Sequence, residues 1–526
     1  MNTIKRIDNY KILVLLPMFS ALLLGLSRLP INLDMLVFVA FIPILYYFEI
    51  NSSNKVGNQD DNFHKRFLWK SSLMHFKNGV VFSTIFLLVS IHWISIVTFP
   101  GFLGILLLFG FIFGLLFWIV GLFYMIKPKC YRLSFILVWL SFEYLTNYTE
   151  FKFPWFNIAY GLKNSINLIQ IAEIGGVTLI GLLILVINYL FYLSITKNKK
   201  YYMISFLILL FWYFGGMYRL QHLEIIETDF KIAVLQGNID QDLKWHSSMI
   251  DSTFNIYESL GKKALKEENV DLIIFPEAAL PVYLLQRKQY YNRLIDIVDN
   301  FNKPVFTGFP YYKQEYLHKG QIEPYLYYNA ANLFTPEYSE EKVYFKNILV
   351  PFGERMPFLD DFPLLWKLQF GQANFEKGTE FGLYKIGGYS FSPLICFEIV
   401  FPQFLRKISY DFNPHFWVNL TNDAWFKKSI GTHQHASMAV FRSIETRKAV
   451  FRSANTGYSF YTTPDGTIHK MTNLYDRTYL TGKLSIYNGI TLYVKYGYLL
   501  PIIIFIFFAL QIFKLLLVSF YKKLMW

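Results

Sequence analysis

The sequence has only two cysteines among its 526 residues, Cys130 and Cys396. Cys130 lies in the basic segment KPKCYR and Cys396 in a distant polar region, so a scaffold held by disulfides is excluded. Charged residues are also scarce, at 17%, whereas 54% of the residues are hydrophobic and 20% are aromatic. The apolar residues form long blocks, which indicates an integral membrane protein rather than several ordinary soluble domains.

Eight charge-poor runs approach the roughly 20 apolar residues that a membrane-spanning helix needs. They cover residues 12–28, 35–50, 79–99, 102–126, 133–148, 175–195, 201–218 and 497–517. The second and fifth runs are short, so we expect them to be tilted, shielded or partly re-entrant. The first run lacks a following small-residue cleavage site and is predicted to be a retained helix. We therefore predict a transmembrane domain of seven helices over 1–220, and a final helix with a short tail over 489–526.

The region 228–488 regains charged residues, asparagine, glycine and proline, and it alternates β-rich runs with helical patterns. This composition predicts a soluble α/β domain held between membrane anchors. If all eight spans are real, the lysine- and arginine-rich loops share one side, which is expected to be cytoplasmic. The α/β domain then lies on the other side, in the periplasm of a bacterium. This topology and attraction to anionic lipid account for much of the net charge of +13, so no nucleic-acid partner is expected.

Four apolar runs of the α/β region end abruptly in polar or charged residues. In α/β sheets the ligand crevice lies outside the carboxyl ends of the strands, so we expect these residues to meet. The runs are DLIIFPEAALP with Glu277, VYFKNILVPFGE with Lys346 and Glu354, FSPLICFEIVFP with Cys396 and Glu398, and HFWVNLTNDAWF with Asn422 and Asp423.

Glutamate, lysine and cysteine together suit acyl transfer through a thioester. The thiol attacks as a thiolate, a nearby cation lowers its pKa, and a carboxylate carries the proton. The lysine, with a backbone N–H, can also stabilise the oxyanion of a tetrahedral intermediate. Taken singly, Cys396 could be a small buried apolar residue, and Glu277 and Lys346 could be loop charges or a salt bridge. Their common position at strand ends favours catalysis.

These motifs resemble a known superfamily. FPEAALP, the segment from Lys346 to Glu354 and ICFE look like the three catalytic motifs of the carbon-nitrogen hydrolases, or nitrilases. The resemblance implies an αββα sandwich whose catalytic triad is Glu277, Lys346 and Cys396.

A narrower resemblance covers nearly the whole chain. VLQGNIDQDLKW (234–245) and the segment 422–457 are similar to the membrane-embedded apolipoprotein N-acyltransferase family, and 154–161 and 171–188 are the best matches among the helices. This implies seven helices, a periplasmic nitrilase-like domain and one final helix. It also implies a monomer in the bacterial inner membrane that needs no cofactor.

The resemblance implies a ping-pong reaction that completes lipoprotein maturation. Cys396 would take an acyl chain from a glycerophospholipid as a thioester and pass it to the α-amine of a diacylglyceryl-cysteine on an apolipoprotein. Glu277 would be the general base and acid, and Lys346 would stabilise the oxyanion and the thiolate. The remaining implied positions are Glu354 and Glu398 as supports of the lysine and the cysteine, and Trp245 and Asn329 at the substrate entrance.

Three positions depart from the pattern of this family. Phe397 stands where tyrosine is frequent, Lys427 where glycine is usual and Thr432 where proline is usual. His433 and His435 form an H-x-H pair, but no cysteine or third ligand is near in sequence, so no metal site is predicted.

Two polar residues, Glu143 and Asn188, fall within predicted spans. Such residues are candidates for function, although each could equally join a hydrogen bond between helices.

Two rival functions also stay open. A membrane-anchored amidase would use the same triad and pass the thioester to water, so an amine acceptor distinguishes it. A transporter or lipid-binding protein with a sensor domain is disfavoured by the intact triad and by the lack of an obvious inverted repeat.

Overall fold

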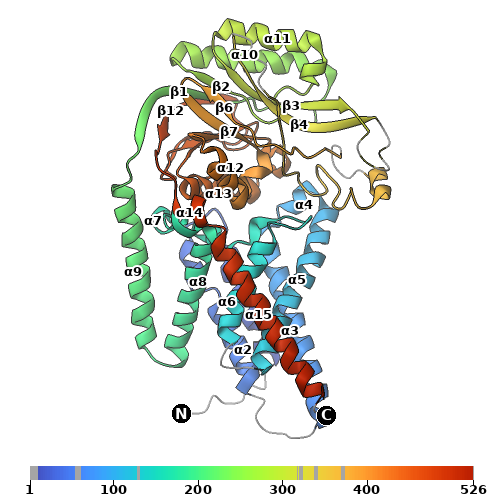
Figure 1. Ribbon diagram of the computed structural model, residues 1–526, viewed down its shortest axis with the longest axis vertical. Helices are drawn as coiled ribbons and strands as arrows, with labels where there is room; N and C mark the ends of the chain where they lie inside the picture. The colour runs from blue at the N-terminus through green and yellow to red at the C-terminus, as the bar shows by residue number, and fades with distance from the viewer. Residues whose placement is uncertain are drawn as a thin grey trace. The chain divides into compact units, whose positions relative to one another are not determined.

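The computed structural model describes residues 10–53, 61–126, 131–316, 318, 321, 324–336, 342–368 and 374–524. Cys130 and the first basic residues of the chain therefore lie outside the described residues. The chain divides into two compact units (Figure 1). One unit comprises Met1–Thr146, Trp155–Gln221 and Tyr496–Trp526, and the other comprises Asn147–Pro154 and His222–Lys495.

The first unit consists of helices. Five helical segments are long and apolar enough to cross a membrane: Ser72–Ser90, Phe99–Tyr124, Ala172–Thr196, Lys200–Gln221 and Leu499–Leu517. Two further apolar helices, Ile12–Ser27 and Leu133–Leu145, are shorter. The helices are α1 (Tyr10–Ser27), η1 (Asp34–Phe38), α2 (Ile42–Ser53), α3 (Asp61–Ser90), α4 (Ile94–Val97), α5 (Phe99–Ile126), α6 (Tyr131–Leu145), η3 (Ile158–Leu162), α7 (Ile166–Ile169), α8 (Ala172–Thr196), α9 (Lys200–Gln221) and α15 (Leu499–Leu524).

The run predicted as a span over 35–50 is divided between η1 and α2. Asn188, from α8, holds this break: its Oδ1 accepts from the Phe41 N–H at 2.9 Å, and its Nδ2 donates to the Val37 carbonyl at 2.9 Å. A buried break in a helix needs such partners for the freed peptide groups. Glu143 acts similarly, because its Oε1 accepts from the Ile158 N–H of η3 at 2.9 Å. Asn188 and Glu143 thus form hydrogen bonds between helical segments, which was the alternative to a functional role for each.

Two six-stranded sheets form the centre of the second unit. The first has the order β12-β1-β2-β3-β4-β5 and the second the order β11-β10-β9-β8-β7-β6. Strands β1 to β3 are parallel, as are β7 to β9. The strands are β1 (Ile226–Gln236), β2 (Leu272–Ile274), β3 (Val305–Gln314), β4 (Tyr325–Phe334), β5 (Tyr344–Phe345), β6 (Tyr384–Ile386), β7 (Tyr389–Ile395), β8 (Phe416–Thr421), β9 (Ala449–Ala454), β10 (Phe460–Thr462), β11 (Ile468–Met471) and β12 (Thr478–Ile486).

The two sheets pack face to face, with helices on both outer faces (Figure 1). Phe306 of the first sheet meets Phe391 of the second, with ring centroids 5.0 Å apart, inside one buried cluster. Helices α10 (Ile250–Glu267) and α11 (Lys288–Phe301) cover the first sheet through a second cluster. On the other side lie α12 (Pro402–Phe412) and α13 (Ile430–Thr446), where Trp417 Nε1 of β8 donates to Thr446 Oγ1 at 3.0 Å. The predicted αββα sandwich is therefore confirmed.

The parallel strands explain the apolar runs that the sequence shows. Every residue of β8 and β9 is buried, because a central strand of a sandwich is covered on both faces. Short elements complete this unit: η4 (Ser247–Met249), η5 (Leu284–Gln286), η6 (Pro363–Lys367), η7 (Cys396–Val400), η8 (Asp423–Phe426) and α14 (Leu492–Tyr496).

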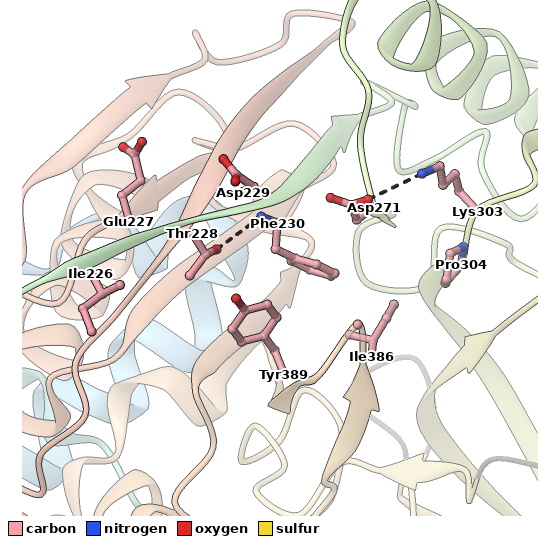
Figure 2. A pocket seen from close by; sticks show the side chains of 11 residues that line it. Ile226, Glu227, Thr228, Asp229, Phe230, Asp271, Lys303, Pro304, Ile386 and Tyr389 are labelled. Carbon is pink, nitrogen blue, oxygen red and sulfur yellow. Dashed lines mark hydrogen bonds and ion pairs between the residues drawn. The ribbon is translucent and has the colours of Figure 1, made fainter.

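A pocket lies at the amino ends of β1, β2 and β3 (Figure 2). Its walls include the carboxylates of Glu227 and Asp229, and Asp271 pairs there with Lys303 at 3.4 Å. The conserved geometry of α/β sheets places ligands at the opposite, carboxyl ends. Glu277, Lys346 and Cys396 are absent from the lining of this pocket.

Candidate active site

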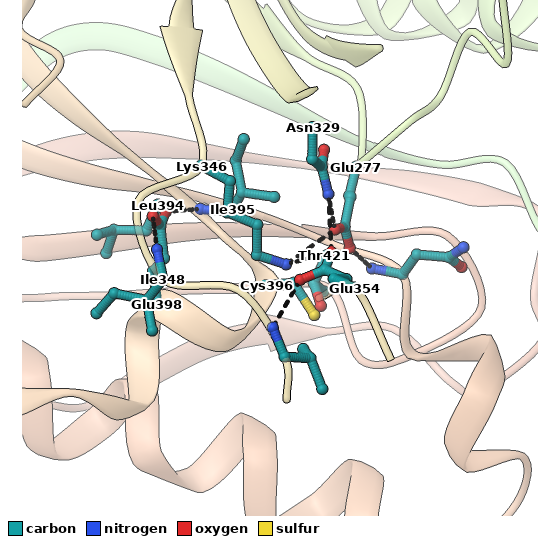
Figure 3. Close-up of polar contacts among 12 residues, drawn as sticks. Glu277, Asn329, Lys346, Ile348, Glu354, Leu394, Ile395, Cys396, Glu398 and Thr421 are labelled. Atoms are coloured by element: carbon teal, nitrogen blue, oxygen red, sulfur yellow. Dashed lines mark hydrogen bonds and ion pairs between the residues drawn. The ribbon is translucent and has the colours of Figure 1, made fainter. Parts of the chain in front are cut away.

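Three loops bring the predicted triad together. Glu277 follows β2, Lys346 follows β5 and Cys396 follows β7. Figure 3 shows these side chains converging from separate segments, so the arrangement expected from the strand ends is present. Glu277 is 7% exposed and Lys346 is 1% exposed. The two side chains therefore stand in a largely dry environment, where charges and hydrogen bonds are stronger than in water.

Lys346 is bound between two carboxylates. Its Nζ lies 2.8 Å from Glu354 Oε1 and 3.5 Å from Glu277 Oε1. The other oxygen of Glu354 accepts from the Val350 N–H at 2.9 Å, which fixes the carboxylate on its own loop. Glu354 thus contacts the lysine from a fixed position, which is the geometry required by the supporting role that the resemblance implied.

The Glu277 carboxylate is held by donors from two other segments. Asn329 Nδ2, on β4, donates to Oε1 at 2.8 Å, and the Asn422 N–H donates to Oε2 at 2.8 Å. The backbone at Glu277 also packs closely on β3: a Cβ built on Gly308 would lie 2.8 Å from the Ala278 nitrogen. Only glycine allows this approach.

Asn329 also donates to Glu354 Oε1, at 3.2 Å, and is 7% exposed. It therefore links the general-base candidate to the carboxylate that supports the lysine. The resemblance placed it at the substrate entrance, whereas these contacts make it a neighbour of the reacting groups.

Cys396 begins η7 directly after β7 and has φ +48°. This left-handed conformation is unfavourable for a residue with a Cβ, so neighbouring contacts must hold it. Glu398 provides several: Oε2 accepts from the Ile395 N–H at 2.6 Å, and Oε1 accepts from the Asn347 N–H at 2.6 Å. Glu398 thereby ties the loop after the lysine to the loop that carries the thiol.

The charges around the triad set its resting protonation state. Burial alone would lower the pKa of Lys346, but the carboxylates of Glu354 and Glu277 outweigh burial and raise it. Burial raises the pKa of the Cys396 thiol, and the negative charge of Glu277 adds to this, while Lys346 opposes it. The expected effect of the lysine on the thiol is present but smaller than the effect of burial. The resting site therefore holds a neutral thiol beside an ammonium.

Burial also raises the pKa of Glu398, to about 7, although backbone donors at Ile395 and Asn347 and the charge of Lys346 favour its ionised form. Tyr344 O–H donates to both oxygens of this carboxylate at 2.8 Å. A fully buried carboxylate with this many donors serves to position the chain rather than to exchange protons with substrate.

Two family models match the chain: carbon-nitrogen hydrolase over residues 231–486 and apolipoprotein N-acyltransferase N-terminal domain over residues 20–190. The apolipoprotein N-acyltransferase of Geobacter metallireducens is 32% identical over 373 residues, covering 69% of this chain and 70% of that protein. This chain belongs to the apolipoprotein N-acyltransferase family. The apolipoprotein N-acyltransferase of Chlorobaculum tepidum is 28% identical over 526 residues, covering 92% and 93% of the two chains. A solved amidase from Nesterenkonia sp. is similar over 50% of this chain and 92% of that chain, at 14% identity and a TM-score of 0.38.

Two of the three departures from the apolipoprotein N-acyltransferase pattern contact each other. Lys427 has φ +48° and ψ −154°, a conformation that suits glycine, the residue expected there. Thr432 Oγ1 donates to the Lys427 carbonyl at 3.2 Å. The threonine thus stabilises the loop in which the strained lysine stands. The third departure, Phe397, packs edge-on against Phe401 at 4.9 Å.

Trp245 is 43% exposed. Its neighbour Lys244 is fully buried, and the Lys244 Nζ donates to the Glu277 carbonyl at 3.3 Å. Burial lowers the pKa of Lys244 to about 8, against the opposing charge of Glu277. The sequence reasoning missed this lysine, and only its place next to Trp245 could have indicated it.

The sequence reasoning also underrated His435. Nitrogen, sulfur and oxygen atoms of His435, Cys396 and Asp423 lie within 4.8 Å of one another, a grouping that could hold a metal ion. Arg452 Nη2 lies 2.8 Å from Asp423 Oδ2 and 3.1 Å from His435 Nδ1. This guanidinium already balances the carboxylate and would repel a cation, so the group fits an orienting network better than a metal site.

Proposed function

We propose that this chain N-acylates the N-terminal diacylglyceryl-cysteine of apolipoproteins, with a glycerophospholipid as acyl donor and Cys396 as the carrier of the acyl group. The observation that supports this most directly is the convergence of a half-buried Cys396 with the buried Glu277 and Lys346 in one site, in a chain of the apolipoprotein N-acyltransferase family. The carboxylate is oriented, the ammonium is charged and the thiol is neutral at rest.

In the first half-reaction, the Glu277 carboxylate takes the proton of the thiol as Cys396 attacks the ester carbonyl of the phospholipid. The tetrahedral oxyanion is stabilised by the Lys346 ammonium, whose charge is secured by Glu354. When the C–O bond breaks, Glu277 returns the proton to the departing oxygen. Lysophospholipid leaves and the acyl chain stays on Cys396 as a thioester.

In the second half-reaction, the neutral α-amine of the diacylglyceryl-cysteine attacks the thioester, and Glu277 accepts a proton from the amine. Lys346 stabilises the second oxyanion. The C–S bond then breaks, the thiolate regains its proton from Glu277, and the amide product leaves. Because one carboxylate serves both halves, its fixed position between Asn329 and the Asn422 N–H is part of the mechanism.

The proposal includes a setting for this chemistry. We place the protein in the bacterial inner membrane as a monomer with eight spans, with 1–220 and 489–526 in the membrane and 228–488 in the periplasm. Trp245 would contact substrate. Support comes from the apolar helices, from the basic loops on one predicted side, and from the need of two lipid-anchored substrates for a site near the bilayer.

The test is to incubate the purified protein in detergent with phospholipid and no acceptor, and to measure its intact mass. An acyl-sized increase on Cys396 is expected, and adding a diacylglyceryl-cysteine peptide should discharge it into N-acylated peptide. Cys396→Ala should form no adduct, whereas Cys130→Ser serves as the matched control and should react normally. Discharge only to free fatty acid with the peptide present would favour the membrane-anchored amidase instead.

A further inference from the structure

The peptide bond after the nucleophile is held from outside its own loop. Cys396 stands at φ +48°, and its carbonyl oxygen lies 3.2 Å from Nε2 of His435, which is 39 residues away on α13. A carbonyl oxygen can only accept a hydrogen bond, so Nε2 carries the proton in this contact. The imidazole is buried, since His435 is 1% exposed, and the contact with Cys396 is partly buried.

The other side of the imidazole is fixed by a charged network. Nδ1 lies 2.9 Å from Asp423 Oδ1 and 3.1 Å from Arg452 Nη2. Thr421 Oγ1 donates to the same Asp423 oxygen at 2.9 Å. Arginine can only donate, so Nδ1 accepts from Arg452, and the single proton of a neutral imidazole then lies on Nε2.

This arrangement orients more than a carbonyl group. In a trans peptide the C=O and the N–H point in opposite directions within one plane, and the described chain has no cis peptide bonds. Binding the Cys396 carbonyl to His435 therefore directs the Phe397 N–H away from His435. A backbone N–H next to the nucleophile is a donor to an oxyanion formed on that nucleophile.

We propose that His435 is a positioning residue: through the Cys396 carbonyl it aims the Phe397 N–H at the oxyanion that Lys346 also stabilises. The inference rests on the proposed thioester chemistry at Cys396. Its rival is a Cys-His-Asp arrangement in which His435 is the base for the thiol. The structure argues against this rival because Nε2 faces the carbonyl oxygen and Nδ1 faces Asp423 and Arg452. Burial and Arg452 lower the pKa of His435, which is consistent with a neutral donor.

The kinetic test compares His435→Leu with His435→Gln, whose amide N–H can still donate to the carbonyl but cannot act as a base. We expect His435→Leu to lower kcat about 10²-fold with KM nearly unchanged, the effect of a misplaced oxyanion donor. His435→Gln should recover most of this loss. The pH profile of Cys396 alkylation should be the same in both variants. His433→Leu, on the same helix and bonded to Tyr458, is the matched control and should keep wild-type kcat.

A second measurement reads the hydrogen bond directly. In a Cys130→Ser background, cysteine labelled with ¹³C at the carbonyl gives one labelled peptide carbonyl, that of Cys396. Its infrared band should move to higher frequency in His435→Leu and stay in place in His435→Gln. If His435→Leu does not fold, His435→Phe, which also lacks a donor, takes its place in both comparisons.

Several outcomes would overturn the inference: wild-type kcat in His435→Leu, a carbonyl band that does not move, or a His435→Gln variant as slow as His435→Leu with a shifted alkylation profile. The last result would make His435 a base. If the wild-type protein fails to acylate the peptide, the proposed function fails, but the infrared band still tests the contact.

Discussion

Replacing Asn329 by aspartate would add a third carboxylate to the site at hydrogen-bond distance from two others. The asparagine now donates through Nδ2 to Glu277 at 2.8 Å and to Glu354 at 3.2 Å. Asn329→Asp exchanges this donor for an acceptor of nearly the same shape. The steric change is minimal, so the variant tests electrostatics.

The repulsion is large on the scale of catalysis. At an effective dielectric constant of about 20, two unit charges 2.8 Å apart repel by about 6 kcal/mol. Each 1.36 kcal/mol corresponds to a factor of ten in proton affinity, so one of the three carboxylates takes up a proton at neutral pH. When the proton resides on Glu277 the general base is lost, which costs about 10²–10⁴-fold in rate. Asn329→Ala only removes hydrogen bonds, worth about 1–3 kcal/mol, and should cost about tenfold to a hundredfold.

The assay is single-turnover formation of the Cys396 acyl adduct, followed by mass as pH is raised from 6 to about 9. Asn329→Asp should be slower than Asn329→Ala at pH 7 and should recover as pH rises and the extra proton leaves. Asn255→Asp, on exposed α10, is the matched control, because its Oδ1 accepts from Arg293 and an aspartate retains that role. If Asn329→Asp equals Asn329→Ala with an unchanged pH profile, the electrostatic reasoning is wrong.

Three further predictions concern lysines. Lys346→Met leaves the buried Glu277 and the partly buried Glu354 without their cation, so acyl-adduct formation should fall by at least 10²–10³-fold. Lys483→Met, in an exposed pair with Glu227, should retain activity. Lys244→Met should lower activity through Glu277 yet stabilise the fold by roughly 3 kcal/mol at pH 7. Because the folded-state pKa of Lys244 is depressed to about 8, the free-energy cost of burying its charge is fully present below pH 8. The increase in melting temperature of Lys244→Met over the wild type should therefore shrink as pH rises toward 10.5. Lys427→Gly should relieve the strained backbone and raise stability by about 1–3 kcal/mol, and an unchanged or lower melting temperature would contradict the strain.

The places of Glu277 and Cys396 in the fold could be predicted from the sequence because each follows an apolar strand. Strand ends are visible as a local pattern, and parallel strands bring their carboxyl ends to one edge of a sheet. This rule places Glu277 at the carboxyl edge of the first sheet and Cys396 at that of the second, and the packing of the two sheets brings the two edges together. The same runs predicted an α/β domain, since strands buried on both faces lack polar alternation, whereas the αββα layering was implied by the resemblance to the carbon-nitrogen hydrolases.

The supporting groups left no comparable signal. His435 appeared as half of an H-x-H pair, whereas its decisive contact is with a backbone carbonyl 39 residues away. Asn188 divides a predicted span by binding Phe41, 147 residues distant. Hydrogen bonds from a side chain to a distant backbone group have no periodicity in the sequence, so sequence patterns cannot predict their partners.

The neutral thiol explains why the general base must lie inside the same buried site. Releasing the Cys396 proton to water would leave one more negative charge beside Glu277 and Asp423, which burial penalises. Passing the proton from Cys396 to Glu277 keeps the number of buried charges constant, so the cost of desolvation largely cancels. The ammonium of Lys346 is already paired with Glu354. It interacts with the new negative charge only when that charge moves from the sulfur to the oxyanion. In the proposed reaction the lysine therefore stabilises the transition state more than the resting thiol, which is the condition for catalysis.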